Sequence, residues 1–164
     1  MRCPAPCLGD ATSDFVAGSQ GNGALDWRYH QDPGAALGID FPELAYGVFA
    51  GLDAYGAAPE PPLIASCADN AGAAECAGLA EHLVVMSDPA ASGAVSAISF
   101  AAPSRGAIRV QGRLRLPDGV SSAETHRVTI SRNARHDYAA ELSFIPTTTP
   151  TELDELVDVL PGDR

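Results

Sequence analysis

The alternation of apolar and polar residues over residues 108–116 constrains the fold more than any other feature of this chain. Its two sets of side chains are Ile108, Val110, Leu114 and Leu116 on one face and Arg109, Gln111, Arg113 and Arg115 on the other. A strand with one apolar face and one arginine-rich face is typical of an antiparallel sheet that is solvated on one side. The pattern therefore predicts sheet structure with a core on the Ile108 side.

Further short segments with strand character follow one another at regular spacing, separated by turns that contain glycine or proline. They cover residues 13–29 (a strand, a glycine-rich turn and a second strand), 63–66, 83–87, 94–100, 125–132, 137–145 and 156–160. Many short strands between turns predict an all-β protein, an antiparallel β-sandwich of jelly-roll type. Residues 31–62 contain five prolines and predict a long irregular insertion with one or two short strands, one of them near residues 43–49.

The length and net charge of the chain limit the number of domains and the kinds of partner that we expect. A chain of 164 residues suits one domain, which we expect over residues 13–164 after a linker at residues 1–12. The net charge of −11 argues against nucleic acid and anionic membranes as partners, because both carry negative charge. No stretch approaches the roughly 20 apolar residues of a membrane helix, so we expect no membrane insertion.

Four cysteines occur as two local pairs, Cys3 with Cys7 and Cys67 with Cys76. An even count favours two disulfides, although free thiols and a four-cysteine zinc site stay open as alternatives. Disulfides would locate the protein outside the cytoplasm. The first residues lack the apolar core of a secretory signal, so the chain is either cytoplasmic or a piece of a longer exported protein.

The order of several motifs resembles the galactose-binding-like accessory domains of secreted bacterial proteins. The motifs are the turn Gln20, Gly21, Asn22 and Gly23, the strand Trp27, Arg28 and Tyr29, the segment 100–112 and the segment 157–163. The resemblance implies a jelly-roll fold, an extracellular or cell-surface location and a carbohydrate or glycoconjugate ligand. Such domains normally continue with a further strand beyond the Gly162 and Asp163 turn, and its absence would leave an open edge for self-association.

Two groups of residues are candidates for ligand binding. Tyr46, Phe49 and Tyr55 form an aromatic group that could stack on a sugar ring or anchor its own segment. Arg109 and Arg113 could bind an acidic sugar or the carboxylates of a protein partner. The alternative for the arginines is pairing across strands, with Glu141, Glu124 or Asp158 as expected partners.

The other candidate sites carry weaker signals. His126, Arg135, His136 and Asp137 invite an acid–base interpretation, but neighbouring residues on a strand point to opposite faces and no nucleophile motif accompanies them. The loop residues Asp10, Asp14, Asp26 and Asp32 could bind a structural calcium ion, without a calcium-loop signature. We therefore expect a non-catalytic extracellular binding module without a required cofactor. The alternatives are a self-associating, adhesin-like subunit and a small hydrolase.

Overall fold

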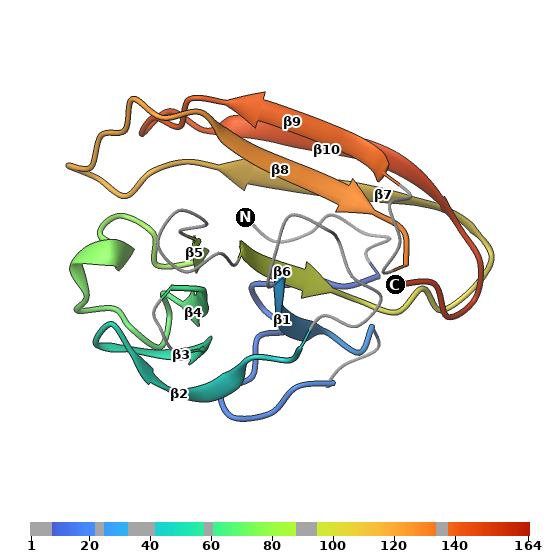
Figure 1. Ribbon diagram of the computed structural model, residues 1–164, viewed down its shortest axis with the longest axis horizontal. Helices are drawn as coiled ribbons and strands as arrows, with labels where there is room; N and C mark the ends of the chain where they lie inside the picture. Colours follow the sequence, from blue (N-terminus) through green and yellow to red (C-terminus); the bar gives the residue numbers. More distant parts are fainter. Residues whose placement is uncertain (1–7, 22–24, 33–41, 58–60, 88–94, 134–137) are drawn as a thin grey trace. The chain divides into compact units, whose positions relative to one another are not determined.

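The structure is a computed structural model, and it describes residues 8–21, 25–32, 42–57, 61–87, 95–133 and 138–164. Ten β-strands and one short 3-10 helix are the regular elements of these residues, and every strand ladder is antiparallel (Figure 1). The all-β class predicted from the sequence is therefore confirmed. The jelly-roll connectivity stays a prediction.

The chain divides into two compact units, unit 1 (Met1–Ala101) and unit 2 (Ala102–Arg164). Each has its own sheets and its own apolar clusters. The single domain predicted over residues 13–164 and the linker predicted over residues 1–12 stay predictions. None of the described helices has the length and apolar character needed to cross a membrane.

Unit 1 has a four-stranded sheet and a two-stranded sheet. The first consists, in spatial and chain order, of β2 (Ala45–Phe49), β3 (Leu52–Gly56), β4 (Leu63–Ser66) and β5 (Leu83–Met86). In the second, β1 (Arg28–Asp32) pairs with β6 (Val95–Ser99). The 3-10 helix η1 (Ala74–Cys76) lies between β4 and β5 in the chain.

Apolar residues cover both faces of the four-stranded sheet. One cluster comprises Tyr29, Leu44, Tyr55 and Ile64, and the other comprises Leu52, Ala54, Leu63 and Ala65. Because successive residues of a strand point to opposite faces, β4 contributes to both clusters. This explains why β4 is apolar at consecutive positions and does not alternate.

The start of unit 1 differs from the predicted strand, turn and strand over residues 13–29. Residues 11–14 form a turn, in which the Asp14 amide donates to the Asp10 carbonyl (2.8 Å), and β1 begins only at Arg28. The Phe15 ring packs on Tyr29 and Tyr55, with centroids 5.2 and 5.5 Å apart. Phe15, which lies in the first of the two predicted strands, therefore anchors a loop to the core instead.

The segment 31–62 contains the two short strands that its sequence predicts, β2 and β3. They form a hairpin in which Tyr46 faces Tyr55 and Phe49 faces Leu52. Instead of leaving the sheet as an insertion, the hairpin makes up half of it, and Leu52, Ala54 and Tyr55 are buried. Prolines precede two strands of the sheet, because Pro42 lies before β2 and Pro61 and Pro62 lie directly before β4.

Unit 2 consists of two β-ribbons. β7 (Gly106–Leu114) pairs with β10 (Thr151–Val159), and β8 (His126–Ser131) pairs with β9 (Tyr138–Phe144). The alternation predicted for residues 108–116 is confirmed as far as Leu114, since Ile108 and Val110 pack against Ala102, Val157 and Val159 in the core. Arg115 and Leu116 lie beyond the end of the strand. From β8, Ile130 packs against the same cluster.

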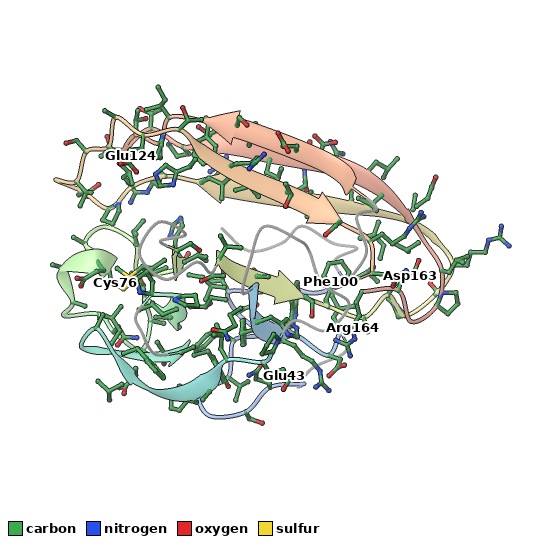
Figure 2. The ribbon with its side chains drawn as sticks, viewed as in Figure 1. Glu43, Cys76, Phe100, Glu124, Asp163 and Arg164 are labelled. Atoms are coloured by element: carbon green, nitrogen blue, oxygen red, sulfur yellow. A yellow bond between two sulfur atoms is a disulfide. The ribbon has the colours of Figure 1, made fainter. Side chains whose placement is uncertain are left out.

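A turn at residues 160–163 fixes the end of unit 2. The Leu160 amide donates to an Asp163 carboxylate oxygen (2.8 Å), and the Asn133 side-chain amide donates to the other (3.1 Å). The Ala102 amide donates to the Asp163 carbonyl (2.7 Å), and the Gly162 amide donates to the Ala102 carbonyl (2.9 Å). Figure 2 labels Asp163 and Arg164 at this turn.

The predicted disulfide between Cys67 and Cys76 is confirmed, with the Cα atoms 5.2 Å apart (Figure 2). Cys67 is fully buried and Cys76 nearly so, and both pack with Leu79 and Val84. The bond closes the loop between β4 and η1. Cys3 and Cys7 lie outside the described residues, so the second predicted disulfide stays a prediction.

Candidate ligand-binding site

Tyr55, one of the three predicted aromatic binding residues, is a core residue. Only 2% of it is exposed, and its ring stacks on Tyr29 with centroids 4.7 Å apart. Its hydroxyl donates to the Val16 carbonyl at 2.6 Å, and burial raises its pKa. Tyr55 therefore packs in the core and has no exposed face for a ligand.

Phe49 belongs to the opposite face of β2 from Tyr46, because the two residues are an odd number of positions apart in one strand. Its ring lies over two glycines: a Cβ at Gly56 would come within 2.6 Å of Phe49 Cγ, and one at Gly47 within 3.3 Å of Phe49 Cε2. It packs with the cluster that includes Leu52. The three predicted aromatic residues therefore do not form one platform.

Tyr46 is the predicted aromatic residue that reaches the surface, with 39% of it exposed. Its ring meets Tyr55 edge-on, with centroids 5.2 Å apart, which fixes its orientation. Val48, two positions along the same face of β2, is 71% exposed. Across the ladder Val48 pairs with Asp53 of β3, so a carboxylate flanks these two apolar side chains.

A side-chain amide holds the neighbouring loop against this face. Asn70 Oδ1 accepts a hydrogen bond from the Asp53 amide (2.8 Å), and Nδ2 donates to the carbonyls of Asp53 and Ser66 (both 2.9 Å). These bonds keep Asp69, the residue before Asn70, close to β3. The pKa of Tyr46 is raised, first by partial burial and then by the charges of Asp53 and Asp69. We call Tyr46, Val48, Asp53 and Asp69 the Tyr46 surface.

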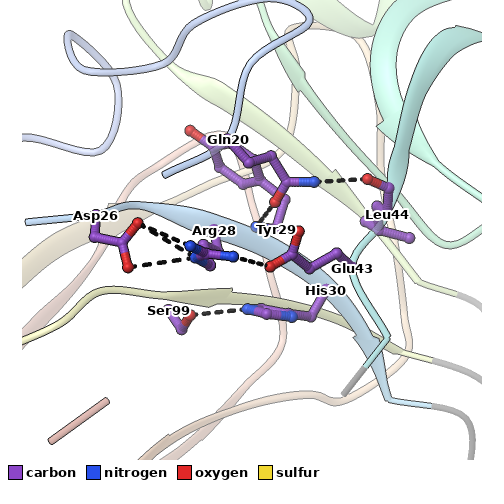
Figure 3. Close-up of polar contacts among 8 residues, drawn as sticks. All are labelled: Gln20, Asp26, Arg28, Tyr29, His30, Glu43, Leu44 and Ser99. Atoms are coloured by element: carbon purple, nitrogen blue, oxygen red, sulfur yellow. Dashed lines mark hydrogen bonds and ion pairs between the residues drawn. The ribbon is translucent and has the colours of Figure 1, made fainter. Parts of the chain in front are cut away.

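A second polar group, centred on Arg28 of β1, lies elsewhere in unit 1 (Figure 3). The guanidinium Nε and Nη2 donate to Asp26 at 3.2–3.3 Å, and Nη1 donates to Glu43 on the other side. Hydrogen bonds to Glu43 and Asp26 raise the pKa of Arg28. With two carboxylates around one guanidinium, this group is a poor receptor for anions.

The Gln20 side chain fastens β1 to the segment before β2. Its Oε1 accepts from the Tyr29 amide (2.7 Å), and its Nε2 donates to the Leu44 carbonyl (2.6 Å) (Figure 3). Beside it, the Leu44 amide donates to the Tyr29 carbonyl (2.8 Å). The amide side chain thus extends a short ladder of main-chain bonds and positions the strand that leads into Tyr46.

His30 and Ser99 form a hydrogen bond between β1 and β6, with Nε2 2.8 Å from Oγ (Figure 3). A histidine at this distance can accept a serine proton, as nucleophile activation requires. In the ladder, however, Ser99 stands opposite Arg28 and His30 stands opposite Ala97, so the bond is a diagonal contact across the sheet. We interpret it as a bond that ties the two strands together.

The predicted arginine face is ion-paired. Arg109 forms two 2.6 Å bonds with Asp154, and Arg113 lies 2.8 Å from Glu152. The predicted pairing of Glu141 with an arginine across the strands is confirmed, because Arg127 of β8 lies 3.7 Å from Glu141 of β9. For Arg109 and Arg113 the expected partners were wrong, because β10 starts five residues earlier than predicted and brings Glu152 and Asp154 into the ladder.

The remaining candidates do not assemble into a site within the described residues. His126 is exposed and its ring lies 6.3 Å from that of Phe144, while residues 135–137 lie outside the described part. Asp14 accepts hydrogen bonds from the Trp27 indole and the Asp10 amide (both 3.1 Å), and Asp26 binds Arg28. The described residues contain no group of three or more acidic, histidine or cysteine side chains that could hold a metal ion.

Sequence reasoning missed the polar residues that build the surroundings of Tyr46. Gln20 binds main-chain groups 9 and 24 residues away, Asn70 binds those of Asp53 17 residues away, and no local pattern reports such bonds. One signal was available: Tyr46 and Phe49 had to face opposite sides of any strand that contained both.

Comparison of the chain with protein-family models, with curated proteins and with solved structures gives no match. The resemblance to galactose-binding-like domains therefore rests on motif order alone.

Proposed function

We propose that the protein is a non-catalytic, extracellular binding module for carbohydrate and that the ligand binds at the Tyr46 surface. The observation that carries this proposal is an exposed aromatic ring held in a fixed orientation beside carboxylate acceptors. The likeness in motif order to galactose-binding-like domains points to the same ligand class.

The chemistry of the Tyr46 surface suits a sugar. A pyranose ring has an apolar face of C–H groups, which packs on an aromatic ring, and hydroxyls at its edge, which donate to carboxylates. Tyr46 and Val48 supply the apolar contact, and Asp53 supplies acceptor oxygens on the same face. Rigid aromatic contacts also lose little side-chain entropy on binding.

An extracellular location agrees with the buried disulfide. Cys67 and Cys76 are oxidised in the structure, and structural disulfides persist mainly in oxidising compartments. The loop that this bond closes carries both Asp69 and Asn70, so the oxidised state also helps to shape the Tyr46 surface.

A glycan array probed with the full chain, followed by calorimetric titration of the best glycans, tests the proposal. We expect Tyr46→Ala to abolish measurable binding, whereas Leu156→Ala, which removes a 69% exposed side chain from unit 2, leaves it unchanged. Arg109→Ala and Arg113→Ala should also bind normally, since both guanidiniums are paired. A uniformly blank array, or full affinity in the Tyr46 variant, would overturn the proposal.

Self-association is the second candidate function, and one observation favours it. In the described part of unit 2, β10 has a ladder with β7 alone, so its other edge has no ladder partner there. Light scattering across a hundredfold concentration range tests this function. Growth in mass with concentration supports it, and a constant monomer mass contradicts it.

A further inference from the structure

The charge of this protein is divided very unevenly between its two units. Residues 1–101 contain two arginines against twelve Asp and Glu, a net charge of −10, while residues 102–164 contain eight arginines against nine Asp and Glu, a net charge of −1. Nearly the whole negative excess therefore belongs to the unit that carries the Tyr46 surface.

Within the described part of unit 1, Arg28 is the single arginine, and it is already engaged. Asp26 and Glu43 bracket its guanidinium, so the group as a whole is negative. In unit 2, by contrast, the arginines of the sheet stand beside acidic partners: Arg109 with Asp154, Arg113 with Glu152, Arg127 with Glu141. Unit 1 thus has negative charge without matching cations, a field that attracts cationic ligands and repels anionic ones.

The charges at the Tyr46 surface have the same sign. Asp53 pairs with Val48 across the ladder, so its side chain lies on the same face of the sheet as Tyr46. Asn70 binds the backbone of Asp53 and so holds the loop that carries Asp69 close to it. A cation above the Tyr46 ring would gain from the π electrons and from both carboxylates together. A uronate or a sulfated sugar would meet two like charges.

We propose that the ligand of the Tyr46 surface is an amine-bearing carbohydrate, a glucosamine oligomer with free ammonium groups, and not a neutral acetylated or an acidic glycan. The inference rests on the proposed carbohydrate-binding function and adds the chemical class of the sugar. Sugar rings supply the apolar contact with Tyr46 and Val48. The ion pairs of the described residues include neither Asp53 nor Asp69, and the ammonium groups supply the positive partner for both carboxylates.

Calorimetric titration of the full chain with three hexamers tests this inference: glucosamine, N-acetylglucosamine and a uronic acid, at a pH where the amine is protonated. We expect the glucosamine hexamer to bind about tenfold more tightly than its acetylated form, from the cation–π and charge terms together. The uronic acid should not bind. Added salt should weaken the glucosamine complex and leave any binding of the acetylated hexamer nearly unchanged.

Two double variants test whether the preference for the ammonium form depends on Asp53 and Asp69. Asp53→Asn with Asp69→Asn should remove the preference for the ammonium form, whereas Glu124→Gln with Glu155→Gln removes two exposed charges from unit 2 and should preserve it. Equal or tighter binding of the acetylated hexamer overturns this inference and leaves the proposed function standing. A preference that survives in the Asp53 and Asp69 variant also overturns it. Binding of none of the hexamers, together with a blank glycan array, overturns both. The hexamer comparison and the salt series use the unmodified chain, so the test holds even if a variant fails to fold.

Discussion

Tyr29 and Tyr55 stack in the core of unit 1 with ring centroids 4.7 Å apart and planes 25° from parallel, yet their hydroxyls have different surroundings. The Tyr55 hydroxyl donates to the Val16 carbonyl (2.6 Å). The Tyr29 hydroxyl is buried without a hydrogen-bond partner among the described residues, and burial strongly raises the pKa of Tyr29. The stacked pair therefore contains one hydroxyl that forms a hydrogen bond and one that forms none with the described residues.

Replacing each tyrosine by phenylalanine should separate these two situations. Tyr55→Phe should lower the free energy of unfolding by about 1 kcal/mol, because a hydrogen bond is lost and the Val16 carbonyl loses its donor. Tyr29→Phe should leave stability unchanged or raise it by about 1 kcal/mol, since a buried unsatisfied hydroxyl is removed. Urea denaturation measures both. A Tyr29→Phe variant less stable than Tyr55→Phe would contradict this account.

Gly56 should be intolerant of a side chain as long as Phe49 is present. A Cβ at Gly56 would lie 2.6 Å from Phe49 Cγ, so Gly56→Ala forces the ring to move and should cost about 1–3 kcal/mol of stability. Combining it with Phe49→Leu should cost less than the sum of the two single changes. Gly72→Ala is the matched control, because a Cβ there meets no atom within 4 Å. Strict additivity in a denaturation cycle would refute the steric explanation.

Two substitutions at Asn70 should have different effects on hydrogen exchange at the start of β3. Asn70→Ala removes the acceptor of the Asp53 amide, so this amide should exchange faster. Asn70→Asp keeps an acceptor oxygen but loses the donor to the carbonyls of Asp53 and Ser66, so protection should persist while stability falls by about 1 kcal/mol. Equal protection of the Asp53 amide in both variants would show that Asn70 does not cap β3.

Acidification should loosen the turn that contains Asp163. Its backbone hydrogen bond from Leu160, and then the bond from Asn133, lower its pKa in the folded protein. A carboxyl with a lowered folded pKa stabilises the fold above its unfolded pKa of about 4, and this contribution disappears as the pH falls through the folded value. Asp163→Asn should therefore be less stable than the parent at pH 6, and the difference should shrink toward pH 2.

Melting temperatures across this pH range measure the effect of Asp163. Glu155→Gln removes the same charge from the middle of β10, away from the turn, and is the control. A stability difference between Asp163→Asn and the parent that stays constant from pH 6 to pH 2 would exclude the proposed linkage.

Strands that alternate strictly, such as β7, and short apolar runs, such as β4, could both be predicted from the sequence, whereas a strand with an interrupted pattern could be predicted only in part. The pattern of β7 defined both of its faces because Ile108 and Val110 alternate with Arg109 and Gln111. In β10, by contrast, Glu155 lies on the side of Val157 and Leu156 lies on the side of Asp154, which interrupts the pattern. The first half of this strand was therefore missed, and with it the partners of the arginines.

The candidate site was predictable only in part. Tyr46 stood out as one of several aromatic residues in an irregular segment, but whether an aromatic side chain is buried depends on the sheet that surrounds it. Tyr55 is buried because β4 and Tyr29 cover it, and these contacts connect residues far apart in the chain. The uneven distribution of charge, in contrast, can be counted from the sequence, but it can be assigned to the two units only once the boundary between them is known.

Gln20 and Asn70 both use a carboxamide where a sheet would ordinarily use another peptide unit. Gln20 occupies main-chain groups beside β1, and Asn70 occupies groups at the start of β3 and the end of β4, so none of these groups needs a partner from outside the chain. The loop that carries Asn70 is held a second time by the Cys67–Cys76 disulfide, so the amide and the covalent bond together fix the main chain beside β3.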